Sequence, residues 1–256
     1  MDFTFSKFEF FIKKVNENYK ILSFENYLKS FKSYKGKLLI LRHDVDRYPK
    51  HSLRIAKIEN KLGISSTFYF RTINSVFKPQ IIKEIALLGH EIGYHYEDLS
   101  ICKGDYEKAI KNFEINLNKL RSYYPVKTIC MHGSPLSPWD NKDIWKKYDY
   151  KNFGIILDTS LDINYNEFFY ITDNGFAWNK TSTSVRDKVK SRFNIKIKNT
   201  DHLIKMIDND KLPDKVALNA HPDTFFDPGL GWFINFSLIK LKNIVKWFIV
   251  KWKVVK

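Results

Sequence analysis

The stretch "ILRHDVDRYP" (residues 40–49) decides the fold, because it joins the end of a buried strand to a cluster of charged side chains. The apolar run over residues 38–41 predicts a strand that is covered on both faces. Asp44 and Asp46 follow this run almost at once. A strand that is apolar along its length and polar at its end is typical of a parallel sheet whose edge opens into a site.

Outward from this strand, apolar runs of the strand type alternate with segments of helical period. β-Branched and aromatic residues mark the strands, and apolar residues three or four positions apart mark the helices. This alternation predicts a parallel sheet with right-handed crossovers. The expected order is a helix near residues 51–62, a strand over 65–71, a helix over 78–89, a strand over 91–96, a helix over 105–124 and a strand within 126–135, then a helix over 200–210 and a strand within 215–222.

Polar side chains stand at the carboxyl ends of these predicted strands. In open α/β sheets and β/α barrels, that edge collects ligand-binding and catalytic groups. We therefore expect the strand-end residues to form one site rather than a scatter of turn residues and helix caps. They are Asp44, Asp46, Arg71, His95, Glu97, His132 and His221.

The residue types indicate hydrolytic chemistry. Asp44 and Asp46 are two positions apart, so a regular strand would project both from one face. Two such carboxylates repel unless a cation or a proton separates them, which suggests one metal ligand and one general base. His95 would complete a mixed nitrogen and oxygen site suited to zinc, and such a metal lowers the pKa of its bound water towards ~7. His221 would then protonate the leaving group.

Four motifs on these strand ends resemble the polysaccharide deacetylase family, carbohydrate esterase family 4. They are "RHDVD" (42–46), "GHEIGYHYE" (89–97), "MHGSP" (131–135) and "LNAHP" (218–222). The resemblance covers residues 36–225 and is greatest to a branch with a Gly-Tyr-His-Tyr-Glu signature. It implies a distorted (β/α) barrel of about seven parallel strands. Because no Gly-, Ser- or Pro-rich linker divides the chain, we expect a single domain over residues 1–256. It also implies metal-dependent removal of an acetyl group from an N-acetylated sugar in a glycan or glycan precursor.

Matching the motifs residue by residue assigns the roles. The resemblance implies that Asp44 is the general base and that His221 is the general acid. It implies that Asp46 and His95 bind a divalent metal ion, which we expect to be zinc, with cobalt or nickel as alternatives. The carbohydrate substrate would contact these groups.

The sequence departs from the family at one metal ligand. The family's second metal histidine lies four residues after the first, and here that position is Leu99. Leucine cannot bind a metal. We predict that Glu97 replaces the histidine, with His132 or Asp98 as alternatives. Otherwise metal affinity is weak, or the chain has lost hydrolysis.

Other residues are candidates for substrate binding. His132 and Ser134 occupy the loop where the family forms its substrate groove. Trp178 would stack on a sugar ring, and Arg186 would orient a carboxylate such as Asp44, unless this stretch is simply a long surface loop.

The chain carries 43 basic and 28 acidic side chains, for a formal charge of +15. This positive charge indicates either binding to anionic partners or simply a lysine-rich surface that is solvated. We expect no specific nucleic-acid binding, because no nucleic-acid-binding motif is present. Two functions compete with the metal-dependent hydrolase: a noncatalytic carbohydrate-binding member of the same fold, and a metal-independent C–N hydrolase. With no signal peptide, we expect a cytoplasmic protein whose Cys102 and Cys130 are reduced.

The tail over residues 226–256 predicts a basic amphipathic helix. Apolar residues recur at steps of three and four, and lysines interrupt the run too often for a membrane span. The tail would either pack on the barrel or lie on an anionic membrane surface through residues 237–256, peripheral to the inner face. The stripe consists of Leu238, Leu241, Val245, Phe248, Trp252 and Val255.

Overall fold

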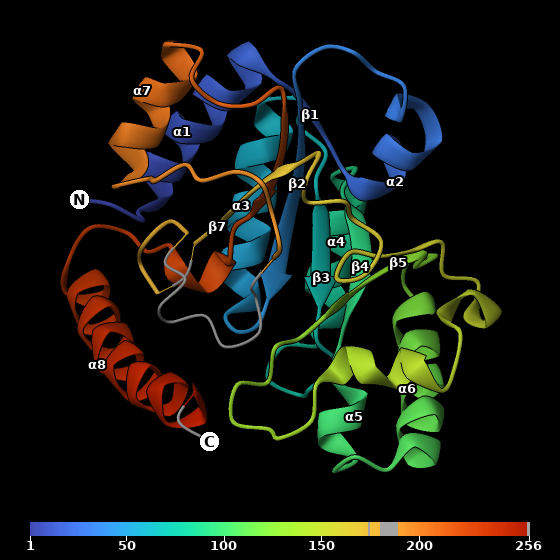
Figure 1. The fold of residues 1–256 in the computed structure, drawn as a ribbon. Helices are drawn as coiled ribbons and strands as arrows, with labels where there is room; N and C mark the ends of the chain where they lie inside the picture. Colours follow the sequence, from blue (N-terminus) through green and yellow to red (C-terminus); the bar gives the residue numbers. More distant parts are fainter. Residues whose placement is uncertain (174, 180–188, 255–256) are drawn as a thin grey trace.

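The computed structural model describes residues 1–173, 175–179 and 189–254, with side chains described up to residue 244 (Figure 1). Within these residues one sheet runs in the order β6-β5-β4-β3-β2-β8-β7, and β1 pairs with β2. The strands are β1 (Lys20–Leu22), β2 (Leu38–Val45), β3 (Thr67–Phe70), β4 (Glu91–Tyr96), β5 (Thr128–Met131), β6 (Leu157–Asp158), β7 (Phe169–Thr172) and β8 (Lys215–Asn219).

Helices connect the strands and cover the sheet. α1 packs against α7, and α3 packs against α4 beside the strands (Figure 1). The α-helices of the described chain are α1 (Phe5–Asn18), α2 (Phe24–Asn26), α3 (Pro49–Lys61), α4 (Pro79–Leu87), α5 (Asp98–Ile101), α6 (Tyr106–Arg121), α7 (Thr200–Asp208) and α8 (Leu230–Val254). No helix among the described residues is long and apolar enough to cross a bilayer.

The strand β2 lies inside the sheet, where it pairs with β1, β3 and β8, and is buried at all eight positions. It pairs with β8 through its first half and with β3 through its second half. Every strand pairing in the described chain is parallel. The sheet curls into an incomplete barrel, which confirms the predicted α/β fold with about seven parallel strands.

The two faces of the sheet bury different sets of side chains. On β3, Phe68 and Phe70 join the large outer core, whereas Tyr69 joins a smaller inner core with Ile40 of β2. This alternation is the period of two that a strand imposes. Asp44 lies four residues after Ile40, so it also belongs to the inner face. A polar group at the end of β2 therefore projects into the mouth of the barrel.

Gly93, in the "GYHYE" motif, is required by the close packing of a tyrosine side chain against it. A Cβ atom on Gly93 would lie 2.2 Å from the ring of Tyr69 and 3.0 Å from the Thr128 carbonyl oxygen. The Tyr69 hydroxyl donates a hydrogen bond to the Thr128 side chain (3.0 Å). Gly93 thus lets an inner-face tyrosine cross β4, two residues before His95.

Elements that precede the predicted core of residues 36–225 still belong to the folded unit. β1 extends the sheet beside β2, and α1 buries one apolar face. The side chain of Phe8 on α1 packs edge-on against Phe225, at the far end of the predicted core. The amino-terminal segment therefore covers the barrel next to the loop that follows β8.

Candidate active site and metal centre

The structure brings five predicted site residues together at the carboxyl edge of the sheet. Asp44 ends β2 and Asp46 follows it, while His95 lies on β4. His132 follows β5, and His221 stands two residues after β8. These side chains meet because parallel strands all present their carboxyl ends on one edge.

Three of these residues converge on one point. The Nε2 atom of His95 lies 3.3 Å from Asp46 Oδ1, and the Nε2 atom of His132 lies 3.6 Å from the same oxygen. Asp46, His95 and His132 each offer a ligand atom within 4.8 Å of the others. Two imidazole nitrogens and a carboxylate oxygen form a donor set suited to zinc or a similar divalent ion.

The hydrogen bonds on the other ring nitrogens fix which atom of each imidazole is free to bind. His95 Nδ1 lies 3.0 Å from the Cys130 carbonyl oxygen, and His132 Nδ1 lies 2.9 Å from Glu97 Oε2. A carbonyl and an ionised carboxylate can only accept, so each Nδ1 carries the hydrogen. In the neutral rings both Nε2 lone pairs then face Asp46. Carboxylate and carbonyl partners of this kind orient metal-binding histidines.

The Asp46 carboxylate lies between the two imidazole rings and is not fully satisfied by hydrogen bonds. Asp46 Oδ1 is buried and has no hydrogen-bond partner. Burial alone would raise the pKa of Asp46, but His132 and His95 outweigh it and hold that pKa well below its usual range. A buried, ionised oxygen between two imidazoles calls for positive charge, and a divalent ion bound by both Nε2 atoms would supply it. These residues therefore fit a divalent metal ion.

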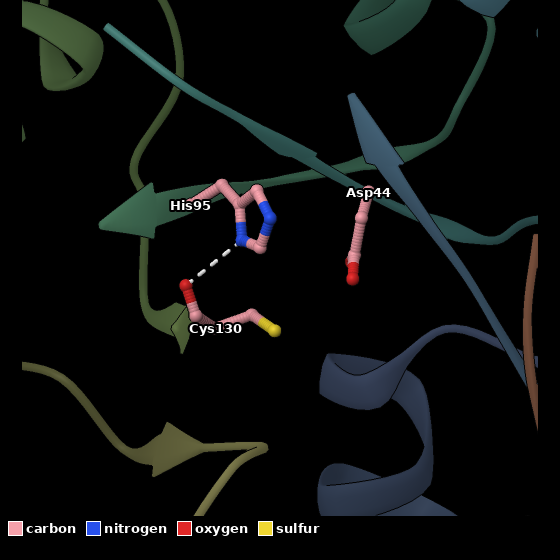
Figure 2. Close-up of side chains that lie close together, drawn as sticks. All are labelled: Asp44, His95 and Cys130. Atoms are coloured by element: carbon pink, nitrogen blue, oxygen red, sulfur yellow. Dashed lines mark hydrogen bonds between the residues drawn. The ribbon is translucent and has the colours of Figure 1, made fainter. Parts of the chain in front are cut away.

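A second group of donors overlaps the first and is less suited to a metal. Figure 2 shows the ring of His95 beside Asp44 and Cys130, with Nδ1 bonded to the Cys130 carbonyl oxygen. The Asp44 carboxylate and the Cys130 sulfur both contact Arg42, at 3.3 and 3.1 Å. Because this guanidinium already supplies positive charge there, a metal ion would be repelled. In the Asp46 group, the guanidinium of Arg71 bonds to the backbone carbonyl oxygen of Asp46 (3.4 Å) rather than to one of the donor atoms.

Glu97 does not fit the predicted role of third metal ligand in this arrangement. Arg71 binds both of its carboxylate oxygens, through Nε at 2.7 Å and Nη2 at 2.8 Å. Glu97 also accepts the hydrogen bond from His132, and it is not among the converging donors. Burial favours its neutral form, but His132 and Arg71 lower the pKa of Glu97. Glu97 therefore lies on the Nδ1 side of His132, away from the candidate metal position, where its hydrogen bond orients the ring.

Asp98 and Leu99, the two other positions considered for the third metal ligand, lie away from the site. Asp98 is fully buried, and its carboxylate accepts hydrogen bonds from the Tyr94 hydroxyl (2.7 Å) and from Asn112 and Asn116 on α6 (2.6 and 3.0 Å). It anchors α6 rather than a metal. Leu99, at the position of the family's second histidine, packs in the hydrophobic core. The alternative that the sequence left open, His132, supplies the third donor.

We expect Glu97→Gln to weaken metal binding about 10- to 100-fold without abolishing it. The amide keeps an acceptor for His132 but loses the negative charge that holds both Arg71 and the imidazole. Competition with a chromophoric chelator measures the change, and Glu114→Gln on the exposed side of α6 is the matched control. Complete metal loss would instead restore Glu97 as a direct ligand, and an unchanged affinity would remove its orienting role.

The candidate base, Asp44, is held in place through only one of its two carboxylate oxygens. Asn219 donates a hydrogen bond to Asp44 Oδ2 (2.9 Å), and Arg42 Nη2 lies 3.3 Å from the same atom. The other oxygen, Oδ1, is buried without a hydrogen-bond partner. Burial would raise the pKa of Asp44, but Arg42 and the nearby His95 lower it. Asp44 is therefore ionised, and Oδ1 is available to accept a proton.

The candidate acid is bound by a residue to which the sequence analysis had assigned no role. His221 Nδ1 lies 2.7 Å from Asp173 Oδ1, which also accepts the backbone N–H of His221 (2.9 Å). The Thr224 hydroxyl donates to the other Asp173 oxygen. His221 Nε2 lies 4.0 Å from Asp44 Oδ2. Partial burial would lower the pKa of His221, but Asp173 and Asp44 raise it to about 10.

The predicted substrate contacts have different outcomes. Ser134 lies beside the candidate metal ligands, with Oγ 3.1 Å from His132 Nδ1. Trp178 is only 3% exposed. Its indole packs against Phe3 and Phe11 and donates to Thr200 Oγ1 (2.9 Å). The sugar-stacking role does not fit this position, because no ring face is open. Arg186 lies outside the described residues.

A scan of family models finds no match to the sequence, and neither does a search of curated proteins. Solved structures with a similar chain path do exist. A carbohydrate esterase family 4 pseudoenzyme from Bacillus anthracis, BA3943, is 12% identical with a TM-score of 0.47. The alignment covers 81% of this chain, which spans only 62% of the length of that protein.

Two further similar structures come from streptococci. The deacetylase PplD of Streptococcus pyogenes is 15% identical with a TM-score of 0.47, over 79% of this chain and 86% of that one. A carbohydrate esterase family 4 member from Streptococcus mutans is 14% identical with a TM-score of 0.46, over 86% and 85%. Since these structures include both a deacetylase and a pseudoenzyme, the activity of this chain has to follow from its own residues.

Proposed function

We propose that this protein is a metal-dependent hydrolase that removes an acyl group, acetyl in the first instance, from the nitrogen of an N-acetylated sugar. The observation that carries the proposal is the convergence of His95 Nε2 and His132 Nε2 on the unpartnered Asp46 Oδ1, next to a separate carboxylate and imidazole. The sequence motifs on these strand ends support the choice of an amide on a sugar as the substrate.

Asp46, His95 and His132 would hold the metal ion. When bound, a divalent ion supplies Lewis-acid catalysis, since it polarises an acyl carbonyl and makes water more acidic. The nitrogen and oxygen donors suit zinc, with cobalt or nickel as alternatives. The Cys130 carbonyl and Glu97 keep the two imidazoles oriented through Nδ1.

The reaction adds water across the C–N bond and yields acetate and a free amine. Asp44 is ionised and has an open oxygen, so it accepts the proton that the attacking water loses. His221 has a raised pKa and is protonated at neutral pH, so it donates a proton to the nitrogen as the C–N bond breaks. Asp173 holds His221 in place and stabilises its positive charge.

The test combines metal content with acetate release. We expect about one divalent ion per purified chain and acetate release from N-acetylhexosamine oligosaccharides. Asp44→Asn should keep the metal and lower turnover about 10²- to 10⁴-fold, because it removes only the proton acceptor. A metal-free protein without release would favour the noncatalytic carbohydrate-binding function. Release that survives a chelator would favour a metal-independent hydrolase.

A further inference from the structure

The helix α8 runs along the outside of the molecule (Figure 1), and one of its faces is apolar and exposed. Six large apolar side chains on its described part are about half exposed or more, between 49% and 76%. At about 100° per residue, they fall on one arc of roughly 140°. These residues define the outer face of α8: Leu230, Phe233, Ile234, Leu238, Leu241 and Ile244.

The opposite side of α8 holds the helix on the protein. Trp232 and Ile239 are buried, and the Trp232 ring stacks on Phe236 at 4.8 Å between centroids. Phe176, from the segment after β7, packs edge-on against both aromatic rings. The helix therefore does pack on the protein, but through a different face from the one that carries Leu238 and Leu241, which are exposed.

The charges on α8 suit a negatively charged surface. Between residue 228 and the end of the sequence there are six lysines and no acidic residue: Lys240, Lys242, Lys246, Lys251, Lys253 and Lys256. Helical spacing puts Lys240 at one border of the outer face and Lys242 at the other. An apolar strip bordered by lysines on both sides is how an interfacial helix lies in a bilayer, with its lysines at the headgroups.

We propose that the outer face of α8 binds the surface of an anionic lipid bilayer. A second copy of the chain fits this face less well. A two-fold dimer brings the same patch of both copies together, so the lysine borders would face each other. On a bilayer the apolar side chains enter the acyl region, and the lysines meet phosphate groups. This inference does not depend on the proposed hydrolase function.

Membrane binding would place the candidate active site close to the headgroups. Asn243 of α8 donates a hydrogen bond to the Gly175 carbonyl oxygen (3.1 Å). Gly175 lies two residues after Asp173, the residue that binds His221. Both α8 and the candidate acid His221 are therefore hydrogen-bonded to the segment that follows β7. A hydrolase held in this way would meet substrates that are themselves at the bilayer surface.

Sedimentation with vesicles tests the proposal on the full chain. We expect binding to phosphatidylcholine vesicles that contain phosphatidylglycerol, weaker binding at high salt, and much weaker binding to phosphatidylcholine alone. The double substitution Leu238→Glu and Leu241→Glu should weaken binding at least about tenfold. Because both side chains are half-exposed or more, the melting temperature should stay near that of the parent.

The matched control places the same charges elsewhere. Leu87 on α4 and Ile115 on α6 are 87% and 66% exposed, and changing both to Glu should leave vesicle binding within about twofold of the parent. Equal loss in both double variants would show only a net-charge effect and overturn the proposal. So would a parent chain that ignores anionic vesicles, or a dimer that the α8 substitutions dissociate.

Discussion

Replacing His132 with alanine is expected to lower metal affinity at least about a hundredfold, more than loss of an orienting residue usually does. The reason is the position of its Nε2 atom, 3.6 Å from Asp46 Oδ1, with the ring held by Glu97 on the other side. Turnover should fall about 10²- to 10³-fold with the loss of Lewis-acid catalysis. Elemental analysis after dialysis and acetate release measure the two effects separately.

His202→Ala is the matched control, because this imidazole is on α7 and bonds only to local backbone atoms in the described chain. It should retain the metal ion and full turnover. Comparing His132→Ala with Glu97→Gln then decides the ligand set. If Glu97→Gln loses the ion completely while His132→Ala keeps it, the assignment of the third ligand is reversed.

The sequence was sufficient to predict which residues meet, because strand topology alone brings them together. Asp44, Asp46, His95 and His221 stand at the ends of apolar runs that had to be parallel strands of one sheet, whose carboxyl ends share one edge. That argument needs only the alternation of strands and helices. It says nothing about how far each side chain reaches, and the choice between Glu97 and His132 as third ligand depends on that reach.

Glu97 and His132 were equal candidates by position, since each follows a strand of the sheet. Their roles are decided by Arg71, which binds both oxygens of Glu97 and draws the carboxylate away from the metal cluster. The guanidinium comes from the end of a third strand, 26 positions earlier in the chain. Such a pairing depends on side-chain conformations, for which the sequence carries no periodic signal.

Asp173 could have been found from the sequence by the same rule as the other residues. It follows "FFYIT" (168–172), an aromatic and β-branched run that forms β7. Recognising this run as a strand would have placed Asp173 at the common edge. Trp178 offered no such signal, because its partners Phe3 and Phe11 belong to the opposite end of the chain. A tryptophan beside a loop is equally compatible with the core and with a sugar-binding surface.

Asp173→Asn should move the alkaline limit of activity down towards neutral pH. Burial would lower the pKa of His221, yet Asp173 is the strongest influence that raises it, to about 10. The acid form of His221 is required, so the rate falls as pH rises through this pKa. Without the charge of Asp173, we expect the pKa to drop by about 1 to 3 units. The variant should lose about 2- to 100-fold in rate near pH 9 and much less near pH 6.

A pH profile of kcat/KM and an NMR titration of the His221 ring in the metal-loaded protein report the shift independently. Asp227→Asn, at a surface ion pair with Arg54, is the control and should leave both curves in place. A purely structural role for Asp173 predicts a rate that falls equally at every pH, with no displacement of the limb. The direction also distinguishes the acid from the base: loss of a base would appear on the acidic limb, whereas His221 holds the proton below its pKa and loses it above.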